Sequence, residues 1–131
     1  MANAPAFAST PVCWSGLVPA TLDTSLTAPT NVTTLGTAGT NGTQINEITC
    51  QAVGSTVAGE VNVFLYDGST YHLYDQFQVP VWTSSTTQSA YRASKTYTNL
   101  WLPSNSWSLR VTNTIAGNQS MLKVTAIGGS L

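Results

Sequence analysis

The chain has 131 residues, of which 42% are hydrophobic and only 7% are charged, and its formal net charge is −1. This length suits a single domain with a real core, and the composition excludes a disordered chain, which would combine low hydrophobicity with high charge. The four basic residues are scattered and no apolar run is long enough for a membrane-spanning helix, so neither nucleic acid nor a membrane is an expected partner.

The first residues predict an extended arm over positions 1–14, in front of a folded domain over positions 15–131. Pro5 and Pro11 favour extended backbone over helix, and Phe7 is the one large apolar side chain in the run PAFASTP. Such an arm either frays or docks on a neighbouring subunit, and a docked arm would use Phe7 as its anchor. The opening lacks the basic start and apolar run of a secretory signal, so no signal peptide is predicted.

Two strands are predicted around Asn41-Gly42. The run VTTLGTAG precedes this dipeptide and TQINEITCQAV follows it. Asn-Gly between extended runs is typical of a type I′ hairpin, because both positions favour positive φ. In the second run Ile48 and Cys50 fall on the face opposite Thr49, and this alternation predicts a half-buried strand.

A second hairpin is predicted at Asp67-Gly68, between the runs GEVNVFLY and TYHLYDQFQV. Both runs alternate with period two, which indicates strands with one face in the core. Pro80 ends the hairpin, since proline cannot donate to a strand ladder. The predicted core face carries Val61, Val63, Leu65, Leu73, Phe77 and Val79.

Three further strands are predicted nearer the C-terminus. A Ser/Thr-rich loop, TSSTTQSA, precedes the runs YRASKTYTNLWL, SWSLRVTN and MLKVTAIGG. Strong helix formers are rare throughout the chain, whereas Thr, Gly, Ser and Asn are abundant. We therefore predict an all-β fold, a single antiparallel β-sandwich of about eight strands behind the arm.

Few residues are available for catalysis, because the chain has five carboxylates and one histidine. His72 lies within a predicted strand and has no nucleophile elbow beside it, while Asp67 is explained as a turn residue. Cys13 and Cys50 are too few for a disulfide framework and are not spaced as metal ligands; they are either two reduced thiols or one bridge. We expect no enzyme, no metal site and no cofactor.

An aromatic surface is the stronger functional lead. Tyr66, His72 and Tyr74 fall on the face opposite the predicted core positions. Sugar-binding and protein-binding surfaces use exposed aromatic strips of this kind. Packing inside a closed sandwich would explain the same pattern, so both interpretations stay open.

Four segments carry a resemblance to a known family: PAFASTP, TNGTQINEITCQAVGSTVAGEVNVFLYDGSTYHLY, LPSNSWSLRVTN and the terminal KVTAIGG. They resemble small structural proteins encoded in the head modules of tailed phages. In size and plan the chain is similar to the decoration, or cement, proteins of double-stranded DNA phage heads. The motifs are hairpins and strands without a chemical signature, so the family supplies no catalytic residues.

The resemblance implies a jelly-roll-like sandwich, often trimeric, made in the host cytoplasm and seated on the outer surface of the capsid. The implied partners are the major capsid protein and further copies of the chain, and Pro5, Phe7 and Pro11 of the arm are the expected contacts. A carbohydrate-binding or receptor-binding module of a tail or adhesin is the alternative. Its surface would be formed by Tyr66, His72 and Tyr74.

Overall fold

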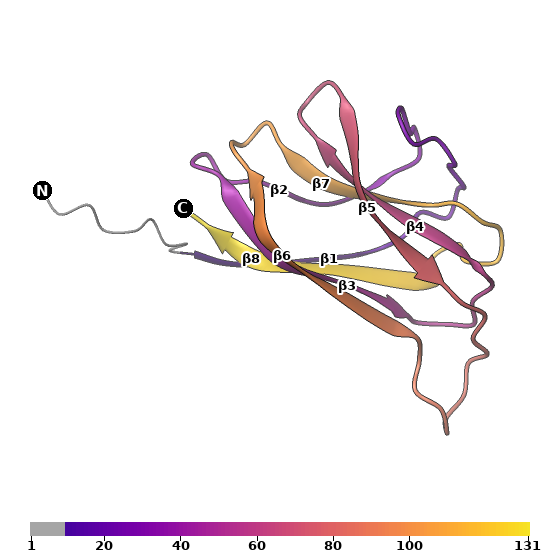
Figure 1. The fold of residues 1–131 in the computed structure, drawn as a ribbon. Helices are drawn as coiled ribbons and strands as arrows, with labels where there is room; N and C mark the ends of the chain where they lie inside the picture. The colour runs from indigo at the N-terminus through magenta and orange to yellow at the C-terminus, as the bar shows by residue number, and fades with distance from the viewer. Residues whose placement is uncertain (1–9) are drawn as a thin grey trace, which may run out of the picture.

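A computed structural model gives the structure of residues 10–131 (Figure 1). The predicted all-β fold is confirmed, because these residues form eight strands. No helix that could span a membrane occurs in this part of the chain. The strands are β1 (Thr10–Leu17), β2 (Thr33–Thr37), β3 (Thr43–Ala52), β4 (Gly59–Tyr66), β5 (Tyr71–Val79), β6 (Arg92–Leu102), β7 (Ser108–Asn113) and β8 (Leu122–Ser130).

Two antiparallel sheets of four strands form the sandwich. Sheet A has the order β1-β8-β3-β6 and sheet B the order β2-β7-β4-β5, and they are the lower and upper layers of Figure 1. β1 pairs with β8, β2 with β7, β3 with β6 and β4 with β5. The chain is therefore one long antiparallel ribbon, with its tip at the turn between β4 and β5, folded over into two layers.

The core lies between the two sheets and is built from alternate residues along the strands. β8 shows the pattern: Leu122, Val124 and Ala126 are fully buried, whereas Lys123 and Ile127 are exposed. This is the period-two alternation of a strand with one face inward. The other large, buried core side chains are Val18, Ile45, Ile48, Val61, Val63, Phe77, Val79, Leu100, Leu102, Leu109 and Val111.

Close packing brings the two sheets together at the edge formed by β1 and β2. Trp14 of β1 packs against the core, and a Cβ atom at Gly36 of β2 would overlap its ring. Glycine at this position therefore lets the indole lie directly on the backbone of the opposite sheet.

The turn at Asn41-Gly42 is present, but the predicted hairpin there is wrong. Gly42 has a φ of 97°, yet Asn41 does not share the left-handed conformation that a type I′ turn requires. The strands on either side, β2 and β3, belong to different sheets. An Asn-Gly pair marks a chain reversal, but contacts distant in sequence decide whether the flanking strands pair.

The second predicted hairpin is confirmed, with a correction to its faces. β4 and β5 pair up to Tyr66 and Tyr71, and Gly68 has a φ of 102°. The register shifts where Val63 faces Asp75 and Phe64 faces Leu73, which leaves Tyr74 as an extra residue in β5. Such a bulge moves the following side chains to the other face.

One predicted core position changes because of this bulge: Leu73 is exposed instead of buried. Phe64, on the face of β4 opposite Val63, is completely buried although it lies outside the main core cluster, and its ring packs on that of Tyr71. Leu65 packs against the core but is only partly buried. Period-two alternation fails at a bulge because one strand gains a residue without a partner.

The predicted boundary of the arm also needs correction. Residues 10–14 belong to β1, where Pro11 lies opposite Gly129. β1 is an edge strand of sheet A, and an edge strand tolerates proline because one of its sides needs no hydrogen bonds. Pro5 and Phe7 lie outside the described residues.

Candidate functional site

Surface clusters are the candidates for function, because residues 10–131 form no pocket. The same residues contain no group of three or more His, Cys, Asp and Glu side chains that could hold a metal ion. Three clusters stand out: a polar cluster between β5 and β6, an aromatic cluster on the outer face of sheet B, and an apolar end formed by loops.

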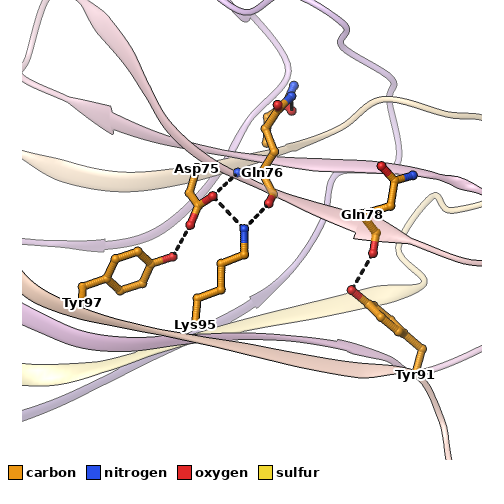
Figure 2. Close-up of polar contacts among 7 residues, drawn as sticks. Asp75, Gln76, Gln78, Tyr91, Lys95 and Tyr97 are labelled. Atoms are coloured by element: carbon orange, nitrogen blue, oxygen red, sulfur yellow. Dashed lines mark hydrogen bonds and ion pairs between the residues drawn. The ribbon is translucent and has the colours of Figure 1, made fainter.

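The polar cluster joins the two sheets along the edge formed by β5 and β6 (Figure 2). The Lys95 ammonium lies 2.8 Å from Asp75 Oδ1 and donates to the Gln76 carbonyl at 2.7 Å. The Tyr97 hydroxyl donates to Asp75 Oδ2 at 2.7 Å. Two side chains of β6, in sheet A, thus hold β5 of sheet B, although β5 and β6 share no backbone pairing.

The electrostatics of this cluster argue against proton transfer. Burial favours a higher pKa for Asp75, but Lys95, Tyr97 and the Gln76 N–H outweigh it, and the net pKa is lowered. Burial, and then the Asp75 carboxylate, raise the pKa of Tyr97. A catalytic acid or base works best with a pKa near the working pH, so Asp75 and Tyr97 act as a structural clamp.

His72 also has a structural environment. Its Nε2 atom lies 3.0 Å from Asp67 Oδ2, and its ring stacks on Trp107 with centroids 5.9 Å apart. Asp67 Oδ1 accepts the backbone N–H groups of Ser69 and Thr70. The Thr70 N–H, followed by His72, lowers the pKa of Asp67. These contacts close the β4–β5 turn. Within residues 10–131, no serine or threonine hydroxyl forms a hydrogen bond with His72, as a nucleophilic triad would require.

The three aromatic-strip candidates do not share one surface. Tyr66 belongs to the outer face of sheet B, where its ring lies 4.3 Å from that of Tyr71 and beneath the guanidinium of Arg110 at 4.2 Å. His72 instead stacks on Trp107. Tyr74, at the bulge, lies 5.5 Å from the ring of Tyr97. The bulge separates side chains that simple alternation would have placed together.

Sequence reasoning missed the third cluster, the apolar end. It lies at the right of Figure 1, where loops 53–58, 80–91 and 114–121 meet. The available signal was the presence of large apolar residues in loops without charge. The apolar end consists of Val53, Val57, Val81, Ile115 and Met121, whose exposed fractions run from 37% to 70%.

Hydrogen bonds hold the loops of the apolar end in place. The buried Asn118 side chain accepts from the Val57 N–H at 2.8 Å and donates to the Val57 carbonyl at 2.9 Å. Thr56 and Trp82 exchange two backbone hydrogen bonds. The apolar end is thus a preformed surface, which lowers the entropic cost of binding a partner.

The two cysteines are both free. Cys50 is buried in the core, where burial raises the pKa of its thiol to about 12. Cys13 is exposed on β1, opposite Ile127. Of the two possibilities open from the sequence, the structure thus has two separate thiols.

Comparison with known proteins gives no family assignment. No model of a protein family matches the chain, and no curated protein matches it.

Proposed function

We propose that the chain is a non-enzymatic structural protein that decorates the outer surface of a phage head and joins neighbouring major capsid subunits. The observation that carries this proposal is the contrast between the two kinds of side chain. Asp75, Tyr97 and Asp67 are engaged in internal hydrogen bonds, whereas the apolar end leaves large apolar side chains in solvent. A surface of that kind suits association with another protein.

The strand pairing supports the same proposal. A ribbon that pairs the first strand with the last and folds into two four-stranded sheets is the plan of a jelly roll, and we infer that fold here. Jelly rolls occur in viral capsid proteins and in lectins. The fold by itself does not select between these roles. The sequence resemblance to decoration proteins favours the capsid role.

Self-association is part of the proposal, with a trimer expected. Several copies acting together provide many attachment points and therefore avidity on a symmetric shell. The contacts between copies would be apolar, because only 7% of the residues are charged. Among residues 10–131, the Lys95–Asp75 ion pair and the His72–Asp67 contact lie within a single chain.

A carbohydrate-binding role is the second candidate, and one observation favours it. Tyr66, Tyr71 and Arg110 form a partly exposed group on the outer face of sheet B. Sugar recognition by aromatic residues needs open ring surface, however. The Tyr66 ring already contacts Tyr71 and Arg110, so this role ranks below decoration of a capsid.

The test uses particles of the phage that encodes the chain. Cryo-electron microscopy should place the sandwich on the outside of the head, and particles lacking the gene should release DNA at a lower temperature. Adding back the purified protein should restore the original temperature. Absence of the protein from the heads would contradict the proposal, and a specific hit on a glycan array that Tyr66→Ala abolishes would favour the second candidate.

A further inference from the structure

We propose that the apolar end of one copy binds the N-terminal segment of a second copy, with Phe7 inserted among the exposed valines. This inference rests on the proposed self-association but does not require a capsid. It assigns a partner to the apolar end, where large apolar side chains from three loops are gathered in solvent.

The apolar end has the chemistry of a docking site. Val81 is 70% exposed and Val53 is 55% exposed, although each lies next to a residue fixed by backbone hydrogen bonds, Trp82 and Ala52. The Met121 side chain lies against Gly54, and the Val57 side chain lies against Gly117. A fixed apolar surface of this kind gains free energy when a partner side chain removes it from water.

The proposed occupant matches this surface in composition. Loops 53–58, 80–91 and 114–121 contain no Asp, Glu, Lys or Arg, and neither do residues 1–9. The segment MANAPAFAS offers Phe7 as its largest side chain, between small residues that allow close approach. Association would therefore bury apolar area without leaving a charged side chain unpaired.

Chain geometry requires the occupant to come from a second copy. β1 starts at the end of the sandwich that holds the C-terminus, and the apolar end lies at the opposite end (Figure 1). β1 has 8 residues, which corresponds to roughly 27 Å. Phe7 is three residues from Thr10 and so reaches at most about 11 Å from it. The Phe7 of a chain cannot meet the apolar end of that same chain.

This contact joins two different surfaces, so it is heterologous. Heterologous contacts close into a ring when the rotation between copies allows it, and otherwise they form an open chain. A ring in which each copy gives its segment to the next is compatible with the expected trimer.

The experiment places a photo-crosslinking amino acid at position 7 of the full chain. Unlabelled and nitrogen-15-labelled proteins are mixed, irradiated and digested, and the crosslinked peptides are identified by mass spectrometry. We expect peptides of mixed isotope composition that join position 7 to loops 53–58, 80–91 or 114–121. Crosslinks within single chains only, crosslinks to other surfaces, or no crosslinks at millimolar concentration would each overturn the proposal.

Point variants give an independent readout by sedimentation velocity. Val53→Ser and Val81→Ser should each weaken self-association about tenfold, the effect of losing one apolar side chain from an interface. Ile127→Ser is the matched control and should have no effect. Ile127 is also a large apolar side chain that is 43% exposed, but it lies on the outer face of sheet A, away from the apolar end. Equal effects of all three variants, or none, would contradict the assignment. A capsid test that fails while the crosslinks form would overturn the proposed function and leave this contact standing.

Discussion

The hydroxyl of Tyr97 donates a 2.7 Å hydrogen bond to the carboxylate of Asp75 and so joins two strands that no backbone pairing connects. At the opposite edge of the sandwich, Trp14 packs on Gly36, and the Thr33 hydroxyl donates one hydrogen bond to the Leu17 carbonyl. The two edges therefore differ in their main contact. One has a close-packed indole beside a single hydrogen bond, and the other depends on several hydrogen bonds and one ion pair.

Tyr97→Phe should lower the free energy of unfolding by about 1–2 kcal/mol, because it removes one hydrogen bond to a charged, partly buried acceptor. Tyr74→Phe is the matched control, since the Tyr74 hydroxyl has no hydrogen bond within the described part of the chain. That variant should stay within about 0.5 kcal/mol of the wild type. Urea unfolding followed by circular dichroism measures both, and equal losses would contradict the role of the clamp.

Acid should destabilise the fold through its paired carboxylates. The pKa values of Asp67 and Asp75 are lower in the folded protein than the ordinary value of about 3.9 in an unfolded chain. The two carboxylates therefore contribute their full stabilisation above about pH 5. This stabilisation is lost progressively as the pH falls below about 4, toward the lowered pKa values of the folded protein.

Asp67→Asn isolates one of these contributions. The variant should be less stable than the wild type at neutral pH, and the gap between their urea midpoints should narrow as the pH falls below about 4. A gap of constant size from pH 7 to pH 3 would show that the Asp67 charge does not contribute.

The packing of Trp14 on β2 gives a third prediction. Gly36→Ala should destabilise the fold by about 1–3 kcal/mol, because the added methyl group overlaps the indole. Gly39→Ala is the control, since its Cβ would meet the side chains of Ser130 and Thr43 only at ordinary contact distances, 3.5 Å and 3.9 Å. In a Trp14→Leu background, Gly36→Ala should cost less, and a double-mutant cycle measures that coupling. Independent, additive effects would rule out the contact.

Local patterns in the sequence predicted the fold class because strand alternation and turn residues act over a few positions. The alternation of Val61, Val63 and Val79 placed them correctly in the core, and Asp67-Gly68 was correctly assigned to a hairpin. Asn41-Gly42 misled the prediction, because sheet membership depends on pairing between residues far apart in the chain.

The candidate site was harder to predict. Period-two alternation placed Tyr66, His72 and Tyr74 on one face, but one bulge in β5 separates them. A bulge leaves little trace in the pattern of polar and apolar residues. The apolar end comes from three loops that only the tertiary structure brings together. The sequence shows that Val53 and Val81 lie in loops, but not that these loops meet.

The bulge itself gives the last prediction, because it turns Leu73 away from the core. Phe64 and Leu73 lie opposite each other; Phe64 is fully buried and contacts the edge of the Tyr71 ring, whereas Leu73 is 38% exposed. Phe64→Ala should therefore cost about 3–5 kcal/mol, as for a buried aromatic residue, and Leu73→Ala less than about 1 kcal/mol. An unbulged hairpin would keep Phe64 on its present face but turn Leu73 toward the core opposite Leu65. A loss of about 2–5 kcal/mol for Leu73→Ala in urea unfolding, the cost of truncating a buried leucine, would therefore show that the strands pair without the extra residue at Tyr74.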